Sequence, residues 1–150
     1  MDKKLKDSLS KIKLLICDID GVLTDGLFIK STSGEELRSF NALDGVGFVV
    51  LRLLDLNVKT AWITGRESLT TTQRAEELQI DDVYNGVIRK IDAYNELKKK
   101  YELSDSEVCF IGDDIIDIPI LEKVGFAVTV PNAPKYLSLI HISEPTRRYA

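Results

Sequence analysis

Three apolar segments of strand length in this sequence each end in a short motif of acidic or hydroxyl residues. Residues 13–19 (KLLICDI) lead into DGVLTDG, residues 58–63 lead into TGR, and residues 108–111 lead into GDDIID. Continuous apolar runs bounded by turn residues are typical of strands that are buried on both faces. Strands of that kind occur in parallel sheets whose two faces are covered by helices, so the chain is predicted to build such a sheet.

The segments between these runs carry apolar residues at helical spacing, which completes a β-α alternation. Helices are expected at 44–56, with Asp44 as the N-cap, and at 68–78, 90–101 and 118–123. Further strands are expected at 82–85 and 126–130. The fold class is therefore α/β, with a parallel sheet between two layers of helices. Ligands of such folds bind beyond the carboxyl ends of the strands, where the three polar motifs fall.

A β-hairpin is predicted at about residues 27–40, because two short strand-like pieces flank Ser33-Gly34. The chain has 150 residues, which fits one domain. We expect that domain to span residues 1–136, and residues 137–150 (LSLIHISEPTRRYA) to form an atypical tail outside it.

Composition excludes several classes of function. The net charge is −4 and the pI about 5.1, which does not favour nucleic acid or an anionic membrane as a partner. No apolar run has the length of a membrane span or of a signal peptide, so a cytoplasmic protein is expected. The one histidine, His141, leaves no basis for Ser-His-Asp triads or histidine-rich metal sites. Cys17 and Cys109 lie in apolar runs and are expected to be buried thiols.

The first motif places Asp18 and Asp20 two residues apart at a strand end. Aspartates are common in turns, and a lone DxD carries little information. The chemical interpretation is that Asp18 attacks phosphorus as a carboxylate nucleophile. Asp20, kept protonated, gives a proton to the leaving alkoxide and later takes one from the hydrolytic water. Two carboxylates this close have pKa values that are pushed apart, as those separate roles require.

The second and third motifs offer groups that bind phosphate. Thr64 either caps the following helix or, with nearby backbone N–H groups, cradles a phosphate. Lys90 lies near the start of a predicted helix, where the helix dipole disfavours a cation, so an anionic partner is indicated. The alternative for Lys90 is an ordinary solvated lysine.

The fourth motif, GDDIID, crowds Asp113, Asp114 and Asp117 at the end of a buried strand. Helix capping explains one of these aspartates but not three. Like charges this close are stabilised by a cation, and ligands that are all oxygen suit Mg²⁺. Together the motifs supply a nucleophile, an acid/base, a phosphate anchor and a metal site, which are the parts that phosphoryl transfer needs.

The four motifs resemble those of the haloacid dehalogenase superfamily of phosphatases. DIDGVLTDG is similar to the first motif, ITG to the second, Lys90 to the third and GDDIID to the fourth. Over about residues 12–136, the hairpin, SFNALDGVG, ITGR, YNGVIRKIDAY and IGDDIIDIPIL are similar to the branch that hydrolyses 3-deoxy-D-manno-octulosonate (KDO) 8-phosphate. This resemblance implies a Rossmann-like fold with a hairpin in place of a cap domain, a homotetramer, and a role in lipopolysaccharide sugar synthesis.

The resemblance also implies roles for single residues. Asp18 would be nucleophile and Mg²⁺ ligand, Asp20 the acid/base with a backbone carbonyl on the metal, and Asp113 a further Mg²⁺ ligand. The supporting residues would be Asp114 and Asp117, the latter acting on the metal or on Lys90. The groups that hold the substrate phosphate would be Thr64, Gly65 and Lys90. Arg66 is a candidate for gripping the sugar carboxylate, with a surface salt bridge as the alternative.

One position in the DG loop departs from the family pattern. Leu43 stands where the family usually has an arginine, so a nine-carbon keto-acid 9-phosphate remains an alternative substrate. Two further functions stay open. A receiver-like signalling module also uses aspartates, a threonine and a lysine around Mg²⁺, although Asp20 would shorten the life of its phosphate. An inactive assembly subunit is the other alternative, since the tail lacks the family's C-terminal segment.

Overall fold

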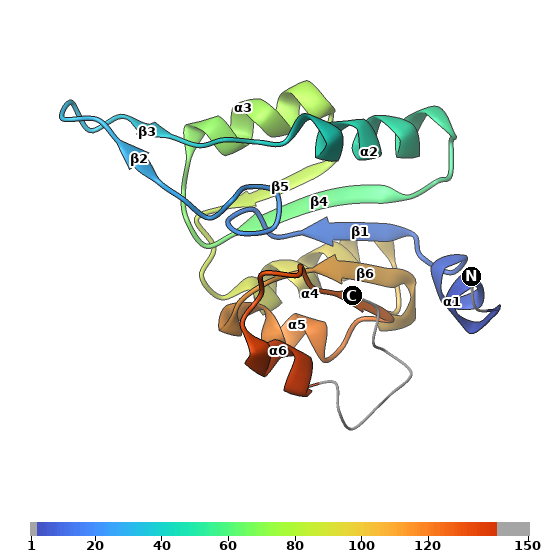
Figure 1. Ribbon diagram of the computed structural model, residues 1–150. Coiled ribbons are helices and arrows are strands. Elements are labelled where there is room, and N and C mark those ends of the chain that lie inside the picture. The colour runs from blue at the N-terminus through green and yellow to red at the C-terminus, as the bar shows by residue number, and fades with distance from the viewer. Residues whose placement is uncertain (1–2, 141–150) are drawn as a thin grey trace.

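A five-stranded parallel sheet forms the centre of the protein (Figure 1). The computed structural model describes residues 3–140. The strand order is β5-β4-β1-β6-β7, which puts β1 at the middle of the sheet. The strands are β1 (Leu14–Cys17), β4 (Lys59–Thr64), β5 (Asp82–Asn85), β6 (Val108–Ile111) and β7 (Phe126–Val128). The α/β class and the parallel sheet predicted from the sequence are confirmed.

Helices cover both faces of this sheet (Figure 1). On one face lie α2 (Ala42–Leu53) and α3 (Leu69–Leu78). On the other lie α4 (Lys90–Tyr101), α5 (Ile118–Leu121) and α6 (Lys135–Ile140). Helix α1 (Lys3–Leu9) precedes β1, and two 3₁₀ turns, η1 (Asp105–Glu107) and η2 (Ile115–Asp117), flank β6.

Successive strand residues alternate between the two helical layers. In β1, Ile16 belongs to the core cluster that includes Tyr94 of α4, whereas Cys17 belongs to the cluster that includes Phe48 of α2. Trp62 of β4 lies in the second cluster, where its ring and that of Phe48 form a T-shaped contact with centroids 5.7 Å apart. Cys17 and Cys109 are buried free thiols, as the sequence predicts. Apolar burial on both sides therefore fixes β1 and the polar loop that follows it.

The hairpin is formed by β2 (Ile29–Lys30) and β3 (Glu36–Leu37), and it projects from one end of the sheet (Figure 1). A bridge between Thr24 and Phe40 closes its base. Its apolar side chains differ in environment. Leu27, Ile29 and Leu37 are 68%, 62% and 57% exposed, while Phe40 stacks on Trp62 with ring centroids 6.4 Å apart.

The predicted N-cap of α2 is wrong. Asn41, not Asp44, holds that position, and its side chain accepts a hydrogen bond from the Leu43 N–H at 2.8 Å. Asp44 instead lies in the first turn, where its charge favours the helix dipole. The helix also ends at Leu53, earlier than expected, because the loop that follows contains left-handed residues at Asp55 and Asn57.

Helix α6 extends beyond the expected domain boundary at residue 136. Leu137 is 1% exposed and packs in the same core cluster as residues of α4 and α5. Residues 141–150 of the expected tail, with His141 among them, lie outside the described residues. Among the helices described, none is long and apolar enough to cross a membrane.

Candidate active site

A buried lysine joins two aspartates at the carboxyl end of the sheet. Asp18 directly follows β1, and its N–H continues the ladder by donating to the Ile111 carbonyl at 2.9 Å. Lys90 is the first residue of α4, and Asp117 ends the 3₁₀ turn after β6. The Lys90 ammonium lies 2.8 Å from Oδ1 of Asp18 and 2.7 Å from Oδ1 of Asp117. Since Lys90 is 1% exposed, the alternative of a solvated lysine is wrong.

The pKa values of Asp18, Asp113 and Lys90 in this site differ from their ordinary values. Burial raises the pKa of Asp18 to about 7, against the opposing effect of the Lys90 ammonium, and the Asp117 carboxylate raises it further. Burial also raises the pKa of Asp113 to about 6, with Asp117 and Asp114 adding to the effect. Burial alone would lower the pKa of Lys90, but the two carboxylates outweigh it and the pKa lies above its ordinary value. One ammonium therefore faces three carboxylates, which leaves an excess of negative charge.

That excess suits a cation. Asp18, Asp113 and Asp117 each offer a carboxylate oxygen, and these oxygens lie within 4.8 Å of one another. Gly21 gives Asp113 the room to approach: its φ is +86°, and a Cβ there would lie 1.9 Å from Oδ2 of Asp113. Hard oxygen ligands around a divalent charge fit Mg²⁺. The donor set therefore fits the metal that the sequence predicts.

The other two aspartates of GDDIID also have defined partners. Asp117 is fully buried; its Oδ1 accepts a hydrogen bond from Lys90, and its Oδ2 accepts hydrogen bonds from the N–H groups of Asp113 and Asp114 at 3.0 and 3.2 Å. Although its position allows metal ligation, these contacts favour a role in orienting Lys90 and the loop. Asp114 caps the 3₁₀ turn through the Ile115 N–H and accepts a hydrogen bond from the Tyr136 hydroxyl at 2.6 Å.

Asp20 and Thr64 line the same end of the sheet. The Thr64 hydroxyl, fully buried, lies 3.5 Å from Oδ2 of Asp20 and accepts a hydrogen bond from the Arg66 N–H at 3.3 Å. Thr64 does not cap α3, since Ser68 is the residue at that N-terminus. Gly65 lies beside Ile88, and a Cβ there would be 3.4 Å from that side chain.

Arg66 points toward the hairpin. Its guanidinium carbon lies 3.8 Å from the ring centroid of Phe28, and Nη1 lies 3.4 Å from Oε2 of Glu36. The Arg66 side chain remains 42% exposed. The predicted surface salt bridge therefore exists, and the side chain keeps part of its surface exposed.

Sequence reasoning missed Arg38. Its side chain is fully buried and lies 3.2 Å from Oδ1 of Asp20, which is the predicted acid/base. It also contacts Glu36 and donates to the Thr71 hydroxyl at 3.0 Å. The available signal was the spacing in ELR, because residues two apart in a strand share a face.

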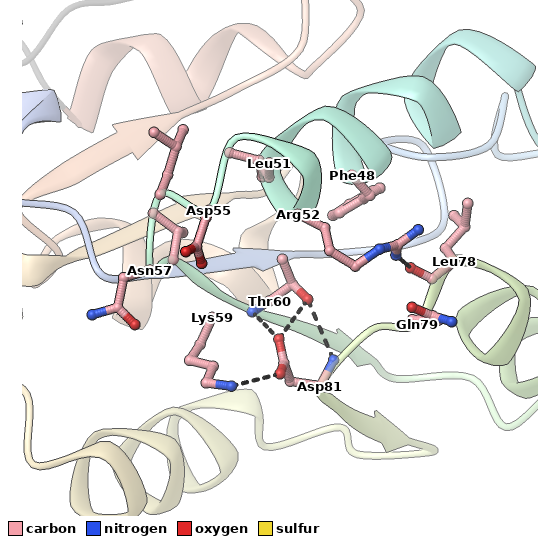
Figure 2. A pocket seen from close by; sticks show the side chains of 12 residues that line it. Phe48, Leu51, Arg52, Asp55, Asn57, Lys59, Thr60, Leu78, Gln79 and Asp81 are labelled. Carbon is pink, nitrogen blue, oxygen red and sulfur yellow. Dashed lines mark hydrogen bonds and ion pairs between the residues drawn. The ribbon is translucent and has the colours of Figure 1, made fainter.

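A cavity of about 330 Å³ lies at the opposite edge of the sheet (Figure 2). Lys59 and Thr60 at the start of β4 line it, and both contact Asp81, while Arg52 donates to the Leu78 carbonyl at 2.9 Å. None of the predicted site residues lines this cavity. The predicted site residues lie instead at the carboxyl ends of the strands, where ligands of such sheets bind.

Comparison with known families places the chain in a hydrolase class. The family model of the haloacid dehalogenase-like hydrolases matches residues 58–140. The chain belongs to this family. The matched segment contains Thr64, Lys90 and the GDDIID motif, whereas Asp18 and Asp20 lie before it.

Individual relatives carry a more specific name. The chain is 43% identical over 124 residues to the KDO 8-phosphate phosphatase of Yersinia pestis, and 41% identical over 122 residues to that of Escherichia coli K12. These alignments cover 83% and 81% of this chain. The chain spans only 65% and 64% of the length of these two relatives.

Solved structures show the same arrangement. The Yersinia pestis KDO 8-phosphate phosphatase superimposes with a TM-score of 0.88 at 37% identity, over 93% of this chain and 74% of that one. The Moraxella catarrhalis KDO 8-phosphate phosphatase, solved with magnesium, phosphate and KDO, gives a TM-score of 0.84 at 33% identity, over 98% and 78% of the two chains.

Proposed function

We propose that this chain is a Mg²⁺-dependent phosphatase that hydrolyses KDO 8-phosphate through an aspartyl-phosphate on Asp18. The observation that carries the proposal is the buried contact of Lys90 with Asp18, beside the cluster of Asp18, Asp113 and Asp117. A carboxylate held by a cation at a metal-binding edge is suited to attack a phosphate ester, whose own charge needs neutralising.

The reaction has two steps, formation of the aspartyl-phosphate and its hydrolysis. Both the Lys90 ammonium and the Ile19 N–H contact Oδ1 of Asp18, so we assign the attack to Oδ2. Oδ2 bonds to phosphorus while the ester P–O bond breaks, and Asp20 gives the leaving alkoxide a proton. Asp20 then takes a proton from water, whose oxygen bonds to phosphorus as the Asp18–phosphorus bond breaks. Inorganic phosphate leaves, and both carboxyl groups return to their initial states.

Mg²⁺ would be held by Asp18, Asp113 and the backbone carbonyl of Asp20. When bound, it supplies positive charge that offsets both the carboxylates and the substrate phosphate. The raised pKa values of Asp18 and Asp113 and the close approach of Gly21 to Asp113 support this assignment. The magnesium ion and phosphate in the Moraxella catarrhalis relative support it as well.

The substrate assignment rests on the relatives and on Arg66. Thr64, Gly65 and Lys90 would bind the phosphate, and the part-exposed side chain of Arg66 would bind the sugar carboxylate. The second candidate is a nine-carbon keto-acid 9-phosphate. Leu43 supports this second substrate as an alternative, because the residue stands where the family usually has an arginine. Its side chain is 75% exposed at the start of α2. A role in lipopolysaccharide sugar synthesis would follow from the KDO assignment.

The assembly we propose is a homotetramer. An isolated two-stranded hairpin is marginally stable in water, yet this one exposes Leu27, Ile29 and Leu37. Helix α2 adds a second apolar surface through Leu43, Val46 and other exposed residues (Val50, Leu53). Packing of several subunits would cover both surfaces and close the site against water.

A phosphate-release assay tests the proposal. Purified protein is given KDO 8-phosphate, a nine-carbon keto-acid 9-phosphate and p-nitrophenyl phosphate, with Mg²⁺ or with EDTA. We expect Mg²⁺-dependent release, fastest with KDO 8-phosphate, and no release by Asp18→Asn. Fastest release from the nine-carbon ester would favour the second candidate.

Adding a small phosphodonor and following the phosphoprotein separates the non-enzymatic alternatives. A receiver-like module would form a long-lived phosphoprotein when given a small phosphodonor, whereas a phosphatase would turn over. An inactive assembly subunit would release phosphate from no ester under any condition, and that result would overturn the proposal.

A further inference from the structure

We propose that Arg38 is a positioning residue for the acid/base Asp20, through which the hairpin fixes the catalytic loop. The inference rests on the proposed function, since it concerns the step in which Asp20 protonates the leaving group. Arg38 follows β3 and lies on the same strand face as Glu36, so its guanidinium reaches back toward the loop after β1.

Each nitrogen of the Arg38 guanidinium has a partner within the protein. Nε and Nη2 each lie 3.3 Å from Oε1 of Glu36, while Nη1 donates to the Thr71 hydroxyl at 3.0 Å and lies 3.2 Å from Oδ1 of Asp20. Its side chain is fully buried, in contrast to the 42% exposure of Arg66. With these contacts and a fully buried side chain, the guanidinium is placed to orient the groups around it.

Asp20 depends on that contact for its orientation. Its Oδ2 is 3.5 Å from the Thr64 hydroxyl, a long contact. Its Oδ1 is buried, lies in ion-pair range of Arg38 without the alignment of a hydrogen bond, and accepts none from the described residues. Arg38 is therefore the principal fixed charge that holds the carboxyl group at the site.

The same guanidinium links three parts of the fold. Glu36 belongs to the hairpin, Thr71 to α3 and Asp20 to the loop after β1. Phe28 adds to the link, since its ring lies 5.3 Å from Arg38 and 3.8 Å from Arg66. The position of the hairpin thus determines where Asp20 lies.

Esters with different leaving groups test this role. An alkyl phosphate needs a proton on its leaving oxygen, whereas p-nitrophenolate leaves without one. General acid catalysis contributes about 10²–10⁴-fold. We therefore expect Arg38→Met to lower kcat/KM by roughly 10²-fold for KDO 8-phosphate and by less than about 5-fold for p-nitrophenyl phosphate. Arg38→Lys, which keeps a charge near Asp20, should recover part of the loss.

A double-mutant cycle with Asp20→Asn separates positioning from general damage. If Arg38 acts through Asp20, Arg38→Met should change kcat/KM by less than about twofold once Asp20 is an asparagine. Should Arg38→Met fail to fold, Arg38→Lys completes the same cycle. Arg52→Met is the matched control, because Arg52 is an arginine of the remote cavity that donates to a carbonyl (Figure 2). Arg52→Met should leave kcat/KM unchanged for both substrates.

These measurements distinguish a positioning role of Arg38 from a structural one. Equal losses on both esters, or an undiminished loss in the Asp20→Asn background, would make Arg38 a structural residue and overturn the inference alone. Full activity of Arg38→Met on KDO 8-phosphate would overturn it as well. A wild-type protein that releases phosphate from neither ester would instead contradict the proposed function, and the inference would fall with it.

Discussion

The ammonium of Lys90 lies 2.8 Å from Oδ1 of Asp18, and neither side chain has appreciable contact with solvent. A buried charge is tolerated when a partner neutralises it, and here Asp117 supplies a second carboxylate at 2.7 Å. Removing the lysine would leave two buried carboxylates without their cation.

Lys90→Met should therefore destabilise the metal-free protein by about 3–5 kcal/mol, the range for breaking a buried pair. It should also abolish phosphate release, since the proposed phosphate anchor is lost. Urea unfolding and the release assay measure the two effects. Lys99→Met, an exposed lysine of the same helix, is the control and should change neither. A stable, active Lys90→Met would contradict the assignment of this ion pair.

Metal removal should have an effect that depends on pH. The pKa values of Asp18 and Asp113 are raised from 3.8 to about 7 and about 6, respectively. From pH 3.8 up to about 7, the folded state therefore holds more protons than the unfolded state. Stability then falls as pH rises through this window, and the full penalty is present above about pH 7. Melting temperatures of the EDTA-treated protein should thus decline from pH 4 to 7.

Mg²⁺ should reverse that decline, because it binds the ionised carboxylates. Its stabilising effect is expected to be larger at pH 7.5 than at pH 5. An effect of Mg²⁺ that is the same at both values would argue against ligation by these two aspartates.

Gly21→Ala should weaken Mg²⁺ binding. The added Cβ would lie 1.9 Å from Oδ2 of Asp113, so this carboxylate has to move. Gly34→Ala is a matched control: Gly34 has a similar φ of +88°, but its Cβ would have nothing within 4 Å. Both variants should lose about 1 kcal/mol through backbone strain. Only Gly21→Ala should raise the Kd for Mg²⁺ in calorimetry; equal affinities in the two variants would remove Asp113 from the metal site.

The sequence was most informative where hydrophobic periodicity and acidic loops coincide. The strand 82–85 and the helix 90–101 have the predicted bounds; in the helix, the buried residues Ala93, Tyr94 and Leu97 recur at the spacing of one helical face. The convergence of Asp18, Lys90 and GDDIID followed from the rule that the strand ends of a parallel sheet share one edge.

Side-chain pairing was not predictable in the same way. The spacing in ELR places Arg38 on the same face as Glu36, but it does not show that the Arg38 side chain is buried and that of Arg66 part-exposed, since their environments depend on how the hairpin packs on α3. The N-cap of α2 is a second example: Asn41 and Asp44 both suit that position, and Asn41 occupies it, accepting a hydrogen bond from the Leu43 N–H. Such choices follow from tertiary geometry and not from spacing.

Arg66→Ala tests the grip on the sugar carboxylate. Loss of a charge-assisted contact should weaken transition-state binding of keto-acid phosphates by about 2–4 kcal/mol, which is measured as a fall in kcat/KM. p-Nitrophenyl phosphate, which has no carboxylate, should be much less affected. Equal losses on both substrates would make Arg66 a phosphate-binding or structural residue, through its contacts with Phe28 and Glu36.

The last prediction concerns assembly, and the structure decides which residues test it. Phe40 is unsuitable, because it stacks on Trp62 and a charge there would damage the core. Ile29 is 62% exposed on the hairpin, so Ile29→Lys should leave the monomer folded. If hairpins pack against one another, this lysine would have to be buried without a partner, at a cost of several kcal/mol for each subunit. We expect light scattering to show a tetramer for the wild type and smaller, less active species for Ile29→Lys. Leu69→Lys, at a 72% exposed position outside the hairpin and α2, is the control and should remain tetrameric. A fully active wild-type monomer would contradict the proposed assembly.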